Sequence, residues 1–146
     1  MELKTRSAAH EAQRLFFEIG MEQRVKVGAQ LGELGLSFAQ AHALRMLDPE
    51  EPLPMSALAD RLFCDASNVT GIVDRLEGRG LVERGSAEGD RRVKALTLTS
   101  AGVELRGRVM GVMNEPPEAI ASLSAADQRA LRDILARAVE RLQAAS

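Results

Sequence analysis

Three basic side chains follow a glycine-containing turn in the segment GDRRVKALTLT, which spans residues 89–99. Arg91, Arg92 and Lys94 stand directly before an alternating run of apolar and polar residues, a pattern that is typical of a strand. A strand fixes the positions of basic side chains, so these side chains can contact the regularly spaced phosphates of a nucleic acid. The types and spacing of these residues therefore predict a nucleic-acid contact.

The local charge of this segment is opposite in sign to that of the whole chain. Between residues 84 and 94 the sequence has four bases and two acids, whereas the 146 residues carry a formal net charge of −2. The bases are Arg84, Arg91, Arg92 and Lys94, and the acids are Glu88 and Asp90. Since binding to nucleic acid depends on local phosphate contacts, we expect modest non-specific affinity that falls with salt.

A second polar set lies on one side of a helix predicted from about Ser67 to Arg79. Its apolar residues share the other side, and Gly80 supplies a left-handed stop. The small residues Ser67 and Gly71 would allow close approach to a groove. The residues whose donors and acceptors suit base edges and phosphates are Asn68, Thr70 and Arg75.

Asp74 fits such a surface poorly, because a carboxylate repels phosphate. It could accept a hydrogen bond from a cytosine amino group or pair with a basic neighbour. Ser67 and Asn68 could instead cap backbone amides, and small polar outward residues also suit an ordinary surface helix. On this helix alone, the DNA-binding and the surface-helix interpretations both stay open.

The elements around these residues predict a winged helix. A short helix, capped by Ser56 and ending near Phe63, and a bend at Cys64 precede the polar helix, which together suggest a helix-turn-helix. The short segment 81–84, which begins with the apolar residues Leu81 and Val82, the turn GSAEGD and the alternating residues 93–99 predict a β-hairpin. A hairpin directly after a helix-turn-helix is the wing of a winged helix.

Further helices flank this core. We expect helices from Ser7 to Leu34, from the capping-box residue Ser37, from Thr99 or Ser100, and from Ser124. Residues 49–54, PEEPLP, are predicted to be a connector because proline interrupts helices. The predicted fold class is mostly α with a small β-hairpin. The predicted domains are an N-terminal dimerisation helix over 1–36, a winged helix-turn-helix over 37–100 with its wing at about 84–94, and C-terminal dimerisation helices over 101–146.

Several other functions lack the residues that they need. No apolar run approaches the roughly 18 residues of a membrane span, and residues 1–20 lack a leader pattern, so we expect a cytoplasmic protein without a membrane partner. The lone Cys64 excludes an internal disulfide, and without a second cysteine it is interpreted as buried filler rather than a redox sensor. His10 and His42 are too few for a metal site, and no phosphate loop or nucleophile motif indicates an enzyme or a cofactor.

Residues 58–102, LADRLFCDASNVTGIVDRLEGRGLVERGSAEGDRRVKALTLTSAG, closely resemble the winged-helix core of the MarR family of transcriptional regulators. The family pattern is matched at Val73 to Glu77, Gly80 to Val82, Asp90 with Arg92, Leu98 with Thr99, and Gly102. The resemblance implies that Arg92 enters a minor groove and that Asp90 orients it. It also implies that the recognition helix reaches the major groove from Ser67, Asn68, Thr70 and Arg75.

The resemblance further implies a homodimer that binds a pseudo-palindromic double-stranded DNA operator, most often as a repressor. A small aromatic or anionic effector would bind between the dimerisation helices and the winged-helix lobes. The residues that could line such a site are Phe16, Phe17, His42, Arg45 and Met46. The competing interpretation is a winged-helix module that binds a protein partner and not DNA.

Overall fold

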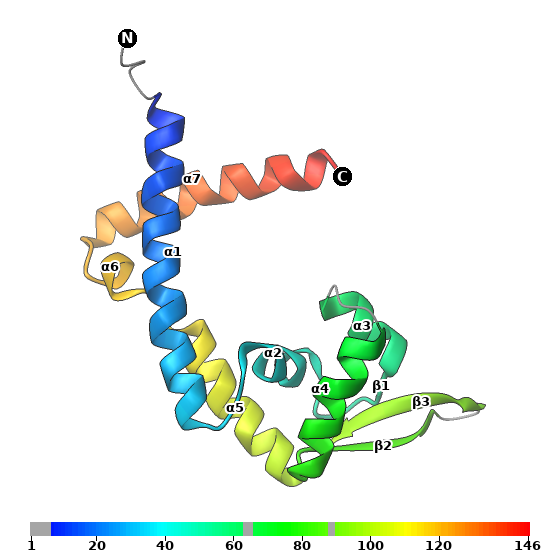
Figure 1. Cartoon of the computed structure of the whole chain (residues 1–146). Coiled ribbons are helices and arrows are strands. Elements are labelled where there is room, and N and C mark those ends of the chain that lie inside the picture. Colours follow the sequence, from blue (N-terminus) through cyan, green and yellow to red (C-terminus); the bar gives the residue numbers. More distant parts are fainter. Residues whose placement is uncertain (1–6, 63–65, 88–89) are drawn as a thin grey trace, which may run out of the picture. The chain divides into compact units, whose positions relative to one another are not determined.

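The computed structural model describes residues 7–62, 66–87 and 90–146, with side chains except at residues 66, 67, 87 and 90–93. The described chain is mostly helical with a small antiparallel sheet, as predicted (Figure 1). Its elements are α1 (Ala8–Glu33), α2 (Phe38–Met46), β1 (Leu53–Pro54), α3 (Met55–Leu62), α4 (Ala66–Gly78), β2 (Val82–Ala87), β3 (Asp90–Leu98), α5 (Ser100–Asn114), α6 (Glu118–Ala121) and α7 (Ala125–Ala144).

The contacts divide these elements between two compact units. One unit, here called the winged unit, is Arg24–Asn114. The other, here called the helical unit, contains the described residues up to Gln23 together with Glu115–Ser146. Helix α1 is continuous and contributes to both.

The core of the winged unit is aliphatic. All the buried hydrophobic side chains of the described residues belong to this unit. The largest fully buried ones are Leu31, Leu44, Leu47, Leu58, Val69, Val73, Leu76, Val82, Leu96 and Val109. They come from helices α1 to α5 and from the sheet, so this single core fixes α4 against the hairpin.

The sheet has the strand order β1-β3-β2, and all its pairs are antiparallel. Strand β1 lies inside the segment PEEPLP, so the prediction that residues 49–54 are only a connector was wrong. Leu53 pairs with Leu96 and Pro54 with Ala95. Proline, which has no N–H, is tolerated here because β1 is a short edge strand.

Local hydrogen bonds explain where the helices begin. The capping box before α2 is confirmed, since Ser37 Oγ accepts from the Gln40 N–H at 3.2 Å and Gln40 Oε1 accepts from the Ser37 N–H at 3.1 Å. Helix α5 is capped by Thr99, whose Oγ1 accepts from the Gly102 N–H at 3.0 Å. Ser56 was wrongly predicted as a cap, because α3 already begins at Met55, directly after β1.

The end of α1 is held by the end of α4. Gly35 has φ +72°, and the Leu36 N–H donates to the Leu31 carbonyl at 2.9 Å, which closes the last turn of α1. Arg79 then donates to the carbonyls of Leu34 and Gly35, at 3.1 and 2.9 Å. A single guanidinium therefore satisfies two carbonyls at the negative end of a helix.

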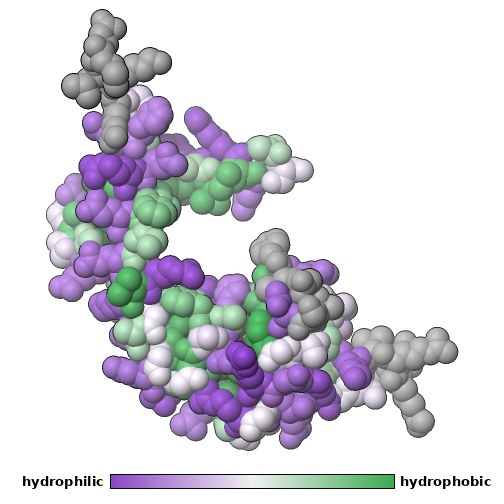
Figure 2. All heavy atoms as spheres, viewed as in Figure 1, coloured by the Kyte–Doolittle hydropathy of each residue, from purple (hydrophilic) through white to green (hydrophobic). Residues whose placement is uncertain are grey.

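The helical unit exposes most of its apolar side chains. Ser124 caps α7 as predicted, since its Oγ accepts from the Asp127 N–H at 3.1 Å. Figure 2 shows apolar atoms on the surface along α7. The large hydrophobic residues exposed in this unit are Leu15, Phe16, Phe17, Met21, Leu123, Ile134, Leu135, Val139 and Leu142. Helix α7 has no buried residue within the described chain.

Candidate nucleic-acid interface

Helix α4 presents one apolar and one polar face, as its sequence predicts. Val69, Val73 and Leu76 are at most 1% exposed, which fixes the rotation of the helix in the winged unit. The predicted contact residues whose side chains are described are all exposed, with Gly71 opposite the apolar face and the others beside it: they are Asn68, Thr70, Gly71 and Arg75. The side chain of Ser67 lies outside the described residues.

Gly71 is not required by packing within the chain. A Cβ atom built on Gly71 meets no described atom within 4 Å. Glycine inside a helix costs roughly 0.5–1 kcal/mol relative to alanine. Packing within the chain therefore gives no reason for glycine at this exposed position of α4.

The hairpin formed by β2 and β3 carries the other predicted contacts. The backbone of Asp90, Arg91 and Arg92 begins β3, and Lys94 is exposed opposite Ser86. The pairing shifts register between Ser86 and Ala87. The three residues at the start of β3 are thus placed by their backbone near the end of the hairpin, while their side chains lie outside the described ones.

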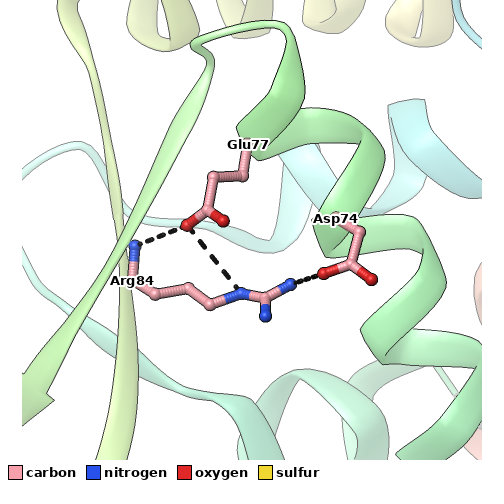
Figure 3. Close-up of polar contacts among 3 residues, drawn as sticks. All are labelled: Asp74, Glu77 and Arg84. Atoms are coloured by element: carbon pink, nitrogen blue, oxygen red, sulfur yellow. Dashed lines mark hydrogen bonds and ion pairs between the residues drawn. The ribbon is translucent and has the colours of Figure 1, made fainter.

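Arg84 joins the hairpin to α4 (Figure 3). Its Nη2 donates to Asp74 Oδ1, its backbone N–H donates to Glu77 Oε2 at 3.3 Å, and its Nε lies 3.9 Å from the same oxygen. Arg84 therefore does not belong among the free bases of the hairpin. Of the alternatives for Asp74, the structure shows pairing with a basic neighbour.

A cavity of about 440 Å³ opens in the winged unit near the start of α2. The guanidinium carbon of Arg24 lies 4.5 Å from the centroid of the Phe38 ring, which is a cation–π contact. The Phe38 ring also packs against Gly28, where a Cβ atom would lie 3.0 Å from Phe38 Cε2. The described residues that line the cavity are Arg24, Phe38, Ala39, His42, Leu62, Ile72 and Met113.

The residues predicted to bind an effector do not all line this cavity. His42 lines the cavity, whereas Arg45 and Met46 are not among its described lining residues. Their backbone carbonyls accept from Arg106 Nη2 at 3.4 Å and from Arg61 Nη1 at 3.0 Å. Phe16 and Phe17 are exposed on the part of α1 that belongs to the helical unit.

Sequence reasoning missed Arg24 and Phe38, because they are separated by the turn at Gly35 and no local pattern joins them. Cys64, predicted as buried filler, lies outside the described residues, as does the bend that it marks. Within the described part of the chain, no three His, Cys, Asp or Glu residues are grouped to hold a metal ion. None of the helices in the described ranges is long and apolar enough to cross a membrane.

Comparison with known proteins relates this interface to a family. Residues 36–94 match the model of the MarR family. The chain is 27% identical over 103 residues to an organic hydroperoxide resistance transcriptional regulator of Bacillus subtilis, covering 66% of this chain and 70% of that protein. It is 35% identical over 82 residues to the HTH-type transcriptional regulator YfiV of the same organism, covering 52% of this chain and 51% of that protein.

Solved structures share the fold. The crystal structure of an S. aureus MepR–DNA complex has a TM-score of 0.68 and 23% sequence identity, and covers 90% of this chain and 97% of that chain. This similarity establishes the winged-helix fold predicted from the sequence. The chain spans about half the length of YfiV and a larger share of the hydroperoxide regulator.

Proposed function

Residues 36–94 match the model of the MarR family, and on that premise we propose that this chain is a DNA-binding transcriptional regulator of that family. The observation that carries the proposal is the exposed polar face of α4, with Gly71 open to solvent, held in one core with a basic hairpin. The relatives compared above are named as transcriptional regulators, which supports the same conclusion. The protein then acts in the cytoplasm as a repressor of genes next to its operator.

In this proposal α4 enters the major groove and the hairpin reaches the adjacent minor groove. Asn68, Thr70 and Arg75, with Ser67, supply donors and acceptors for base edges and phosphates. Gly71 allows the backbone to come close. Arg92 inserts into the minor groove, where a narrow groove concentrates negative potential. Asp90 orients Arg92, and Arg91 and Lys94 contact phosphates.

We propose that the operator is read by a homodimer formed through the helical unit. Large apolar side chains of this unit are left exposed within the described chain, and such faces mark interaction sites. The proposed partner is a second copy of the chain, because in a two-fold dimer the same apolar face of both copies is buried. Two-fold symmetry then predicts a pseudo-palindromic operator with half-sites about one helical turn apart.

The direct test is selection of binding sites from a random duplex DNA library at low salt, with the Arg92→Ala variant in parallel. We expect the wild-type protein to enrich a palindromic consensus. The variant should bind it about tenfold more weakly, the typical loss for one groove contact. Arg108→Ala, which removes an exposed cation from α5, is the matched control and should retain full affinity.

A winged-helix module that binds a protein partner is the competing function. It predicts no enriched sequence for the wild-type protein and no effect of Arg92→Ala on partner binding. Failure of the wild-type protein to enrich any sequence at low salt would therefore replace the DNA-binding proposal with this one.

We also propose that the cavity beside Phe38 receives a small aromatic or anionic effector. Its walls are mainly apolar, and Arg24 and His42 supply the polar groups, which suits an aromatic carboxylate. With benzoate as the probe, calorimetry should show binding to the wild-type protein and at least tenfold weaker binding to Arg24→Met. Equal benzoate affinity in both proteins would contradict this assignment.

A further inference from the structure

The contact between Arg84 and α4 lies at the point where the hairpin leaves the core of the winged unit. Earlier in this part of the chain, Leu81 and Val82 are buried. Later in β2, Gly85 and Ser86 are exposed. The Arg84 side chain, which is 24% exposed, is thus the last described side chain of β2 that packs against the body of the unit.

Arg84 uses both its backbone and its side chain in this contact. The backbone N–H and the guanidinium group both face Glu77, and the far end of the guanidinium reaches Asp74, one turn earlier on α4. Two attachment points one helical turn apart resist rotation of a strand better than one point does. The geometry therefore restrains the direction of β2 relative to the axis of α4.

We propose that Arg84 is a positioning residue, which sets the angle between the hairpin and α4 through Asp74 and Glu77. The proposal rests on the DNA-binding function proposed above. It explains why an acidic residue occurs on the exposed side of α4: Asp74 serves DNA binding by holding Arg84, without a contact to DNA. The hairpin contacts reach the minor groove only while this angle is kept.

A simpler role for Arg84 is to neutralise the carboxylates of α4. Arg84, Asp74 and Glu77 together carry a formal charge of −1, which Arg84→Met changes to −2 and Asp74→Asn changes to 0. If neutralisation were the whole role, these two variants would change DNA affinity in opposite directions. If Arg84 sets the hairpin angle, both variants weaken DNA binding, because both weaken the tie, which is the contact of the Arg84 side chain with Asp74 and Glu77: Arg84→Met removes the guanidinium group, and Asp74→Asn removes the negative charge that it meets at Asp74.

The test measures the affinity of each variant for the operator selected by the wild-type protein, together with the DNA footprint. We expect Arg84→Met and Asp74→Asn to bind about tenfold more weakly, with loss of protection in the flanking minor grooves only. Glu83→Gln, which makes the same charge change as Asp74→Asn at an exposed neighbour of Arg84, is its control. Tighter binding by Asp74→Asn, or an unchanged footprint for both variants, would overturn the proposal.

A second measurement does not depend on DNA. Hydrogen exchange in the free protein should be roughly fivefold faster for the hairpin amides in both variants, while α4 and α5 keep their protection. Unchanged exchange in the hairpin would refute the tie even if the proposed DNA function fails. Failure of the wild-type protein to bind DNA, with faster hairpin exchange in the variants, would reject that function and leave the tie supported.

Discussion

At two positions, Gly71 on α4 and Arg24 in the cavity, burial alone does not explain the type of residue. Gly71 is exposed and makes no packing contact that requires glycine, yet it lies between residues suited to base contacts. Arg24, in the cavity, is held over Phe38 by its charge. At both positions, the proposed contact with DNA or with an effector would account for the type of residue.

Replacing Gly71 with Ala separates stability from DNA binding. The variant should be more stable by about 0.5–1 kcal/mol, because alanine is the better helix former and its Cβ meets open space. Its affinity for the operator should fall, since the new methyl group stands on the face of α4 that we propose to approach the major groove. Chemical denaturation and operator binding measure the two effects. Unchanged affinity with raised stability would favour an ordinary surface helix.

The start of α5 is joined to the start of the hairpin by close contacts of Thr99 and Gly102. Helix α5 begins against the start of the hairpin, where the Thr99 N–H donates to the Leu81 carbonyl at 3.1 Å and Thr99 Oγ1 donates to the Gly80 carbonyl at 2.6 Å. Gly102, in the first turn of α5, faces the same Leu81 carbonyl so closely that a Cβ atom would overlap it. The overlap explains why a glycine occupies position 102, where the sequence matches the MarR pattern.

Two alanine substitutions in α5 should therefore have opposite signs. Gly102→Ala should lower the free energy of unfolding by about 2–3 kcal/mol, because the backbone at Leu81 must move to relieve the overlap. Gly107→Ala, where no described atom lies within 4 Å of the new Cβ, should raise it by about 0.5–1 kcal/mol. Denaturant unfolding of both variants provides the comparison. Equal effects would contradict the close approach of α5 to Leu81.

The tie from α4 to the end of α1 can be tested in the same way. Arg79→Met should destabilise the protein by about 1 kcal/mol, since two carbonyls at the helix end lose charged donors but remain accessible to water. Arg75→Met, which removes an exposed cation from the last turn of α4, is the stability control. A variant at Arg79 that unfolds at the wild-type denaturant concentration would show that the tie contributes nothing.

At the scale of the whole molecule, the two units differ in how they are stabilised. The winged unit has its own buried core, whereas the described side chains of α7 include no buried one. Ile134 is 53% exposed, Val139 49% and Leu142 70%. Such an apolar face is costly in water, and a second copy that covers it would stabilise both chains.

Charged substitutions on this face should separate the dimer. Ile134→Glu combined with Val139→Glu should convert the protein to a monomer in light scattering, because two carboxylates would be desolvated at the interface. Arg129→Glu changes the net charge by the same −2 on the side of α7 that points away from these apolar side chains and should leave a dimer. A wild-type protein that is already monomeric at micromolar concentration would contradict the proposed homodimer.

The sequence by itself determined the order of the longer helices and of the β2–β3 hairpin, and it determined the faces of α4. Helical periodicity and capping spacings such as Ser37 with Gln40 are local, because residues three or four apart interact whatever the rest of the chain does. Only the tertiary structure decided that Arg84 pairs with Asp74, that Arg79 holds the end of α1 at Gly35, and that Leu53 joins the sheet. Such partners are set by which elements pack together around the core, and short-range patterns carry no record of that packing.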